Sequence, residues 1–381
     1  MRNKADTLII GGGASGLMAG AILGSRALVL ESNDEAGRKL LLTGGGRCNF
    51  THNSAPLELL RHYYEAKNFV RYPLYAFTPI DIISFFDSIG VPSYTDDDNR
   101  VYPVTDSSSD VVSALVRRCR IAKGKALSIE KSESIFRIRT EDSEYEAGNV
   151  ILAAGGSSYP HTGSDGNGYR LAKALGHRIE PVRPALAPII FQEPLKGAMG
   201  ITIDARLKKG RNEAEGSIVI TGNGISGPAA ENLSRHFCGK EEIVVSFLDI
   251  TPEEIKAMNG RTMLRNALPL PERLTSALVG EIAEKRIADL RKEELRIISE
   301  RLSGYRTPAW AGSNGAMSSR GGVDRREIDS RTMESKLVKG LYFAGDIVDV
   351  DAECGGYSLT WAFASAKTAA CSINESAPML L

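Results

Sequence analysis

Glycines near the amino terminus and one glutamate have the types and spacing that bind a dinucleotide. The glycine-rich run is Gly11-Gly12-Gly13-Ala14-Ser15-Gly16. Gly11 permits a tight turn out of a strand, Gly13 lets the backbone approach a pyrophosphate, and Gly16 lets the following helix pack closely. The amides at the start of that helix, which include those of the Ala and Ser, hold the phosphates. Glu31 can accept hydrogen bonds from a ribose diol and disfavours a 2′-phosphate.

The flanking sequence supplies the elements that must position these residues. A strand from Thr7 to Ile10 precedes the glycines, an Ala-rich helix continues to about Gly24, and a second strand from Ala27 to Leu30 ends on Glu31. All of these features agree with one another. The sequence therefore predicts a dinucleotide-binding unit rather than a glycine-rich turn in some other α/β protein.

A second glycine-rich stretch lies between Ala36 and Asn53. Gly44 to Gly46 need backbone freedom and expose amides, and the cations Arg38, Lys39 and Arg47 lie beside them. Such a loop suits a pyrophosphate or an isoalloxazine ring. Its expected cofactor contacts are Arg38, Lys39, Gly45, Gly46, Arg47 and Cys48. Alone, this composition would favour a mobile surface loop.

Two later segments have buried strands that end on glycine. The apolar run from Val150 to Ala154 predicts a parallel strand closing on Gly155, so Ala154 and Gly155 are candidate contacts. Leu341 to Ala344 is a short strand followed by Gly345 and Asp346. The Asp346 carboxylate can accept a ribityl or ribose hydroxyl.

The last glycine pair introduces a helix from about Ser358 to Cys371. Its N-terminus, with Gly356, Tyr357 and Ser358, can stabilise negative charge on the N1/O2 edge of a reduced flavin. A plain strand, loop and helix with a capping Asp is the alternative. The pairing of an amino-terminal dinucleotide unit with this carboxyl-terminal segment favours a flavin over a nicotinamide.

Composition narrows the class of protein. Lys+Arg and Asp+Glu both number 47 in 381 residues, so no net basic field attracts nucleic acid or anionic lipid. The sequence has neither a hydrophobic stretch of the ~18 residues needed to span a bilayer nor a signal peptide. Five scattered cysteines without a CxxC pair indicate reduced thiols. We therefore expect a cytoplasmic enzyme.

The motifs also resemble those of a known family, the HI0933/YhiN-type FAD-binding flavoproteins, which are related to the glutathione reductase type of FAD fold. The matching segments are GGGASGLMAG, GRKLLLTGGGRCN, ILAAGGSSYPHTGSDGNGY, TGNGISGP, TMESKLVKGLYFAGDIVDVD and CGGYSLTWAF, in the family's order from residue 11 to residue 363. Asp346 stands where many relatives carry Glu, and Arg320 stands where a small residue is common. Either carboxylate should serve for FAD.

The resemblance implies an α/β fold in which a Rossmann-like FAD-binding domain is built from both ends of the chain. We expect residues 1–190 and 319–381 to form this domain. Residues 191–318 should be an inserted domain with β-barrel and helical parts, the helical part covering about 253–304. Tight, noncovalent FAD is the expected cofactor.

The pattern of the residues agrees with an insertion. Strands are predicted from Ile201 to Leu207, Ser217 to Thr221 and Ile243 to Leu248. The charged stretch from Glu281 to Leu302 reads as two short helices broken near Arg291 to Glu293. On one face of the first helix lie the apolar residues Ala283, Ile287 and Leu290. On one face of the second lie Leu295, Ile298 and Leu302.

The insert also contains a second literal GxGxxG, from Gly222 to Gly227. A strand precedes it and a helix from Pro228 to His236 follows, so a second Rossmann domain for NAD(P)H is an alternative. Against this alternative, Glu241 and Glu242 precede the next strand instead of following it. Residues 251–304 also offer no convincing strand to complete the unit.

Residues for catalysis are harder to assign. Tyr159, Arg47 and Arg320 are the candidates, with His52 and His161 weighed beside them. We expect a substrate pocket between the flavin ring and the insert, lined by the Arg47 to His52 loop, Tyr159, the Gly222 to Gly227 loop and Arg320. Cys48 and Cys354 are more typical of small buried residues than of reactive thiols. Asp349 and Asp351 read as hydrogen-bonding anchors of a loop, and we predict no metal.

The predicted function is an FAD-dependent oxidoreductase that transfers hydride between flavin N5 and a small organic molecule. The resemblance points to amine oxidation of the aminoacetone oxidase kind or to alkene reduction of the bile-acid or steroid kind. NAD(P)H remains an electron donor to test. The alternative class is a flavoprotein with structural or sensory FAD and a partner-binding insert. No nucleic-acid or membrane partner is expected, and the sequence does not determine the oligomeric state.

Overall fold

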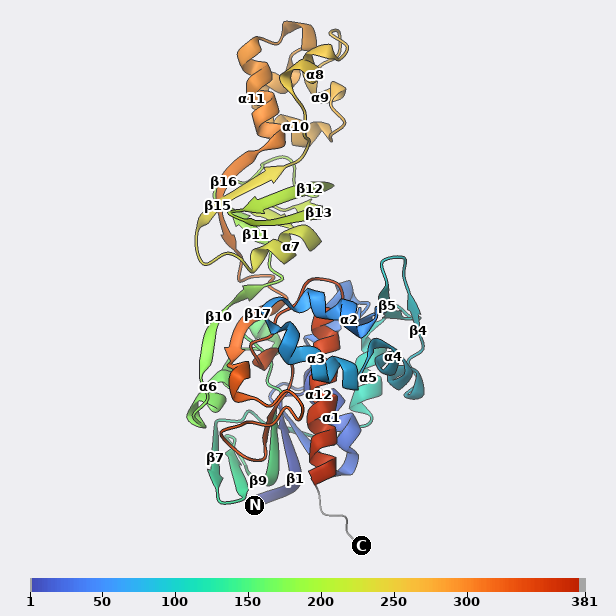
Figure 1. Ribbon diagram of the computed structural model, residues 1–381, viewed down its shortest axis with the longest axis vertical. Coiled ribbons are helices and arrows are strands. Elements are labelled where there is room, and N and C mark those ends of the chain that lie inside the picture. Colours follow the sequence, from blue (N-terminus) through green and yellow to red (C-terminus); the bar gives the residue numbers. More distant parts are fainter. Residues whose placement is uncertain (1, 377–381) are drawn as a thin grey trace. The chain divides into compact units, whose positions relative to one another are not determined.

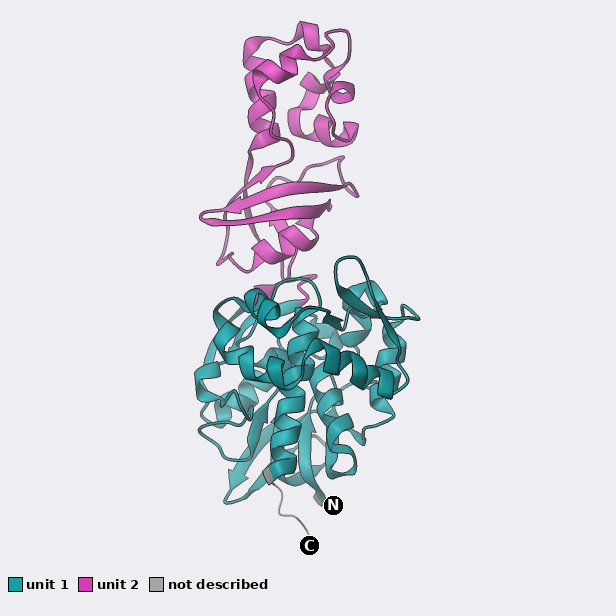
Figure 2. Ribbon diagram, turned by 45° about the vertical axis from the view of Figure 1, so that its right-hand side comes forward, with its two compact units in different colours: residues 1–182, 318–381 teal, residues 183–317 magenta. Residues whose placement is uncertain are grey.

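The computed structural model describes residues 2–376, which divide into two compact units (Figure 2). Within the described chain, residues up to 182 and from 318 onward form unit 1, and residues 183–317 form unit 2. Each unit has its own hydrophobic core. Unit 2 runs from Arg183 to Met317, and Ile189 and Phe191 belong to its core.

Unit 1 contains a mixed sheet, two small sheets and most of the long helices. Its strands are β1 (Arg2–Ile10), β2 (Ala27–Glu31), β3 (Thr51–His52), β4 (Ser93–Thr95), β5 (Arg100–Pro103), β6 (Ile121–Lys123), β7 (Ser128–Ser132), β8 (Ile135–Arg139), β9 (Glu144–Leu152), β10 (Ile179–Ala185, which ends in unit 2), β17 (Ser318–Val323) and β18 (Leu341–Phe343). Its α-helices are α1 (Ala14–Leu23), α2 (Pro56–Leu59), α3 (Lys67–Ala76), α4 (Pro79–Ser88), α5 (Ser108–Val116), α6 (Asn167–Ala174) and α12 (Tyr357–Ser376). The 3-10 turns are η1 (Gly24–Arg26), η2 (Leu40–Gly46), η3 (Leu60–Ala66), η4 (Pro160–Thr162), η7 (Arg325–Glu327) and η8 (Gly345–Ile347).

The central sheet of unit 1 joins the two ends of the chain. Its path runs β6-β2-β1-β9-β8-β7, and β18 pairs in parallel with the last part of β9. The β1, β2, β6, β9 and β18 pairings are parallel, while β7, β8 and β9 form an antiparallel meander. β1, β9 and β18 end in apolar residues buried on both faces, as parallel strands require. The strands predicted around Thr7, Ala27, Val150 and Leu341 are confirmed.

Helix α12 connects the carboxyl-terminal segment to the amino-terminal unit. It packs against α1 and α3 (Figure 1). Its buried residues include five alanines, Ala362, Ala364, Ala366, Ala369 and Ala370, and side chains this small allow close packing between helices. The helix begins at Tyr357 and extends to Ser376, beyond the predicted end at Cys371. The glycines near both ends of the chain therefore lie in one unit.

Unit 2 combines a closed barrel with a group of short helices. Its strands are β11 (Ile189–Phe191), β12 (Thr202–Lys209), β13 (Asn212–Ile220), β14 (Gly224–Ser226), β15 (Glu241–Ser246) and β16 (Tyr305–Ala311). Its helices and 3-10 turns are α7 (Pro228–Ser234), α8 (Pro252–Ala257), α9 (Leu264–Ala267), α10 (Glu272–Val279), η5 (Gly280–Glu284), η6 (Ile287–Asp289) and α11 (Lys292–Ser303). The barrel closes in the order β11-β14-β13-β12-β15-β16, and α8 to α11 gather at one end of it (Figure 1).

Alternating side chains build the barrel core. Ala205 and Leu207 in β12 and Ile243 and Val245 in β15 are buried, while the residues between them are more exposed. This period of two is the pattern expected for strands with one buried face. The three predicted insert strands are confirmed, and β11, β14 and β16 are additional.

One predicted helix of the insert is wrong. Residues 283–290 do not form a helix but two 3-10 turns, η5 and η6. The chain between them is extended because it pairs with an earlier segment. Leu264 N donates to Lys285 O at 2.9 Å, and Ile287 N donates to Thr262 O at 3.0 Å. The second helix is confirmed as α11, with Leu295, Ile298 and Leu302 buried.

The second GxGxxG does not belong to a Rossmann unit. Gly224 to Ser226 is the barrel strand β14, which pairs antiparallel with β11 and β13. A Cβ on Gly224 would lie 2.1 Å from Ile189 O, so glycine is needed there for the approach of two strands. The arguments against a second Rossmann domain at this motif are confirmed.

Candidate cofactor and active site

The turn between β1 and α1 has the geometry that its glycines predict. Gly11 has φ of 104°, and a Cβ there would lie 2.5 Å from Ala153 O. A Cβ on Gly16 would lie 1.8 Å from Gly11 O, so glycine alone lets the helix sit this close to the strand. The space beside Gly13 is open to 4 Å. The turn is therefore tight on its protein side and open on the side where a pyrophosphate would approach.

Glu31 is buried at the end of β2 and already organises the same turn. Its Oε2 accepts a hydrogen bond from Gly12 N at 2.7 Å. Its Oε1 accepts from Asn33 N at 2.8 Å and from Asn33 Nδ2 at 2.7 Å. Ser32 Oγ also donates to Oε1, at 3.3 Å. Oε2 accepts only from Gly12 N among these donors, so its second lone pair remains for a ribose hydroxyl. Glu31 thus has a structural role beside the predicted one.

The loop around η2 exposes successive amides. Gly44, Gly45 and Gly46 have φ of 57°, 66° and 91°, and the space beside Gly45 and Gly46 is open. Left-handed conformations of this kind turn backbone amides toward a concave surface that suits anions. Cys48 follows with a fully buried side chain. Burial raises the pKa of the Cys48 thiol to about 12, so it is a neutral thiol and not a nucleophile.

Lys39 joins three segments that are far apart in the sequence. Its Nζ donates to Ser158 Oγ at 2.7 Å and to Asp346 Oδ2 at 2.9 Å. A Cβ on Gly345 would lie 2.0 Å from Ser15 Oγ, so the Gly-Asp turn rests on the first turn of α1. The predicted cation and the predicted acid therefore neutralise each other within the protein, while Arg38 stays exposed and donates to Asn33 Oδ1 at 3.2 Å.

The start of α12 is built against the residues that follow the η2 loop. A Cβ on Gly356 would lie 2.9 Å from Thr51 O. With its amide oriented to satisfy both partners, Asn49 donates to Thr51 O at 2.8 Å and accepts from Gly356 N at 3.2 Å. Ser358 Oγ is buried and forms no hydrogen bond with the described residues. An unsatisfied hydroxyl beside a helix N-terminus fits a polar ligand edge, such as the flavin pyrimidine.

Tyr357 clusters with two histidines, His52 and His62, whose ring centroids are 6.4 Å from each other. Its ring stacks on His62 with centroids 4.1 Å apart and on His52 with centroids 4.9 Å apart. His62 Nδ1 lies 2.8 Å from Glu353 Oε2. Sequence reasoning missed Asn49, His62 and Glu353 as site residues. Asn49 stands inside the quoted GGGRCN motif and could have been included, whereas no local signal links His62 with Glu353.

The three predicted catalytic residues are placed differently. The Arg47 guanidinium is exposed and lies 4.4 Å from the centroid of the Tyr102 ring. Tyr159 has φ of 53° and meets the His161 ring edge to face at 5.5 Å. Arg320, in β17, is partly buried and lies 3.8 Å from Glu65. The three come from separate segments of unit 1, and their role in catalysis stays a prediction.

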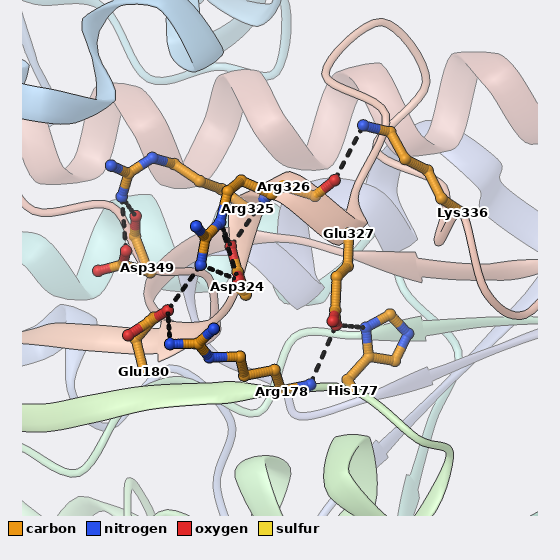
Figure 3. Close-up of polar contacts among 9 residues, drawn as sticks. All are labelled: His177, Arg178, Glu180, Asp324, Arg325, Arg326, Glu327, Lys336 and Asp349. Atoms are coloured by element: carbon orange, nitrogen blue, oxygen red, sulfur yellow. Dashed lines mark hydrogen bonds and ion pairs between the residues drawn. The ribbon is translucent and has the colours of Figure 1, made fainter.

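Asp349 is a hydrogen-bonding anchor, as its spacing from the strand predicts. Its Oδ1 accepts from Gly321 N at 3.1 Å, and its Oδ2 pairs with Arg325 at 2.5 Å (Figure 3). The loop that follows Asp346 is therefore tied to β17, the strand that carries Arg320. Among the described residues, no group of three His, Cys, Asp or Glu could hold a metal ion, and no helix is long and apolar enough to cross a membrane.

Fold and site together define a class of protein. A parallel sheet, a glycine turn at the N-terminus of α1, an acid at the end of β2 and a second helix N-terminus from the far end of the chain are the parts of a Rossmann-type FAD enzyme. A family model described as the HI0933-like protein Rossmann domain matches residues 5–372. The chain belongs to the HI0933-like family and is an FAD-dependent oxidoreductase.

Two curated relatives match almost the whole chain. One, named ribosomal RNA dihydrouridine synthase, is from Escherichia coli strain K12 and is 29% identical over 95% of this chain and 96% of its own. The other, named 3-dehydro-bile acid delta(4,6)-reductase, is from Clostridium scindens and is 32% identical over 94% of this chain and 96% of its own.

The fold also resembles that of a solved steroid enzyme. The 3-ketosteroid delta1-dehydrogenase from Sterolibacterium denitrificans superposes with a TM-score of 0.55 and 12% identity, covering 98% of this chain and 100% of that chain. At this identity the likeness concerns the fold alone.

Proposed function

We propose that this protein reduces a carbon–carbon double bond that is conjugated with a carbonyl group. The observation that carries the proposal is the shared chemistry in the names of the two relatives described above. Dihydrouridine forms when the double bond of uracil that is conjugated with a ring carbonyl is saturated. The delta(4,6) double bonds of a 3-dehydro-bile acid are conjugated with its 3-keto group. Saturation of the double bond next to the carbonyl places hydride on the β carbon and a proton on the α carbon.

The cofactor for this chemistry is FAD, which supplies the hydride when bound and reduced. We propose that it is held without a covalent bond. The proposed contacts are Gly11, Gly13, Ala14, Ser15, Gly16, Glu31, Arg38, Lys39, Gly45, Gly46, Arg47, Cys48, Ala154, Gly155, Gly345, Asp346, Gly356, Tyr357 and Ser358. The open space beside Gly13 and Gly45 and the unsatisfied Ser358 hydroxyl support this assignment.

The chain's own groups must bind and polarise the substrate carbonyl. Negative charge develops on that oxygen as hydride reaches the β carbon, and a fixed cation stabilises it. Of the three catalytic candidates, Arg320 suits this role best, because its guanidinium is partly buried while Arg47 is exposed. We propose Arg320 as the residue that binds the carbonyl oxygen and Tyr159 as a residue that packs near the ring.

Charge favours a small substrate over RNA. Proteins that bind nucleic acid present a basic surface to the phosphates. In unit 2 several bases are paired with neighbouring acids, as in Arg296 with Glu293 and Glu300 and in Arg265 with Glu284. A small unsaturated ketone is therefore our first substrate class. A uracil in ribosomal RNA is the second candidate, because a whole-length relative bears that name.

The proposal is tested by anaerobic mixing. Enzyme reduced by NADH, NADPH or dithionite is mixed with an unsaturated 3-ketosteroid, with ribosomal RNA, or with buffer. We expect the ketosteroid to restore the visible absorbance of oxidised flavin and to yield the saturated ketone. If only RNA reoxidises the flavin, the proposed reduction of a conjugated double bond stands and the substrate is the uracil of ribosomal RNA. If neither probe reoxidises the flavin, and an amine bleaches the oxidised enzyme, the protein is an amine oxidase and the proposal is wrong.

The noncovalent state has a separate check. Acid precipitation should leave FAD in the supernatant. Flavin that remains with the precipitated chain would contradict this part of the proposal.

A further inference from the structure

His62 and Glu353 form a close pair beside the proposed cofactor contacts. His62 belongs to η3, and its Nδ1 lies 2.8 Å from Glu353 Oε2. Glu353 N also donates to the carbonyl oxygen of His62 at 3.1 Å, so the two residues are held by both side chain and backbone. Each side chain is 32% exposed. The pair is fixed within the protein and is reachable from solvent.

The contact determines which nitrogen of His62 exchanges protons. A carboxylate that accepts from Nδ1 holds the imidazole in the Nδ1–H tautomer. The other nitrogen, Nε2, forms no hydrogen bond with the described residues. A carboxylate paired with a histidine in this way is the arrangement of a general acid–base pair.

The neighbouring rings are less suited to donate a proton. Burial, followed by the charge of Glu353, raises the pKa of Tyr357 to about 12, so its phenol holds its proton strongly at neutral pH. Burial and then the charge of His62 lower the pKa of His52. His52 Nδ1 is also bound to Ser54 Oγ at 2.8 Å. The other charged groups that act on these rings are Arg100 on both, Asp96 on His52 and Glu58 on Tyr357.

The pair stands next to two proposed parts of the site. His62 stacks in parallel on Tyr357, at 10° between ring planes, and Tyr357 is the first residue of α12. The same η3 segment carries Glu65, which lies 3.8 Å from Arg320. The proposed carbonyl-binding guanidinium and the histidine are thus both attached to one seven-residue segment.

We propose that His62 is the general acid of the reaction and that Glu353 is the residue that positions it. The inference rests on the proposed function. As hydride and its electron pair reach the β carbon, the double bond opens toward the carbonyl. The α carbon then takes the proton from His62 Nε2, so a C–H bond forms and the N–H bond breaks. Neutral His62 regains a proton from water.

The first test does not depend on turnover. Nitrogen-15 NMR of labelled, substrate-free holoenzyme reports the tautomer of each imidazole. We expect the neutral form of His62 to carry its proton on Nδ1, and we expect this preference to be lost in Glu353→Gln. An Nε2–H tautomer in the wild type would overturn the proposal.

The second test is kinetic and uses matched substitutions. Reduced wild type, His62→Gln, Glu353→Gln and the control His236→Gln, which lies in unit 2, are mixed anaerobically with the unsaturated 3-ketosteroid across a pH series. We expect His62→Gln to be slower by about 100-fold or more and to lose its pH dependence, as removal of a general acid predicts. The rate of Glu353→Gln should lie between those of the wild type and His62→Gln, and His236→Gln should react at the wild-type rate. Added imidazole should partly restore the rate of His62→Ala.

The outcomes separate this inference from the proposed function. A wild type that reduces the ketosteroid, together with a His62→Gln variant of equal rate and unchanged pH profile, would overturn the role of His62 alone. A wild type that reduces neither ketosteroid nor RNA would overturn the proposed function and this role with it. FAD content, measured by visible absorbance, shows whether each variant has folded. If His62→Gln does not fold, the rate of Glu353→Gln still tests the role of the pair.

Discussion

The chain contains the same glycine spacing twice, once in each unit, and the two copies need glycine for different reasons. In unit 1, a Cβ on Gly16 would lie 1.8 Å from Gly11 O, where a helix leaves a parallel strand. In unit 2, a Cβ on Gly224 would lie 2.1 Å from Ile189 O, where two antiparallel barrel strands meet. The first copy leaves open space at its middle glycine, whereas the second fills that place with a partner strand. A motif therefore indicates a ligand only when strand and helix surround it in the right order.

The largest expected effect comes from adding one methyl group to each copy. Gly16→Ala should abolish FAD binding, because its Cβ cannot be accommodated without moving α1 from β1. Gly224→Ala should disturb the barrel but leave FAD bound, because its clash lies wholly in unit 2. Visible flavin absorbance and circular dichroism of the two purified variants measure the difference. Loss of FAD from Gly224→Ala with unit 1 still folded would contradict the claim that only the first glycine motif serves FAD binding.

A smaller effect is expected at the acid that only the first copy possesses. Glu31→Gln keeps the size of the side chain but replaces one acceptor oxygen with a donor. It should weaken FAD binding by about 1.5–3 kcal/mol, the range for a hydrogen bond to a charged group. Titration of apoprotein with FAD measures this change. The matched control Glu242→Gln alters an exposed barrel residue paired with Arg306 and should bind FAD as the wild type does. An unchanged affinity in Glu31→Gln would remove Glu31 from the site.

The smallest effect concerns a buried histidine that supports the carboxyl-terminal strand of unit 1. Ser335 Oγ accepts from Leu337 N and Val338 N, so its own hydrogen goes to His177 Nε2 at 2.9 Å. The Nδ1–H of His177 then donates to Glu327 Oε2 at 3.1 Å (Figure 3). Burial lowers the pKa of His177 below 6.5, so the unfolded chain binds the proton more strongly. The stability that this residue supplies should be complete above about pH 6.5 and should fall as the pH drops below it.

This expectation is measured by denaturant unfolding. His177→Asn should cost about 0.5–1.5 kcal/mol per lost hydrogen bond near pH 7.5, and the difference from the wild type should shrink toward pH 5. A difference that grows as the pH falls would show that the imidazole is charged in the folded protein.

The sequence predicted features that backbone geometry dictates and missed those that side chains from distant segments create. Gly11, Gly16 and Glu31 were found because a tight turn and a strand end restrict the residue type. The His62–Glu353 pair joins positions 291 residues apart, and no local pattern marks it. The helix predicted over residues 283–290 was wrong for a related reason. Their helical spacing of apolar side chains is real, but backbone pairing of Lys285 and Ile287 with the segment at Thr262 to Leu264 overrides it.

The central claim is that the cofactor site belongs to unit 1 alone, and one measurement tests it most directly. A chain in which residues 183–317 are replaced by a short linker should purify with FAD and show the visible spectrum of a bound flavin. Every proposed FAD contact, from Gly11 to Ser358, remains in this shortened chain. If the shortened chain is colourless and gains no flavin on reconstitution, while the full chain holds FAD under the same conditions, the claim is contradicted.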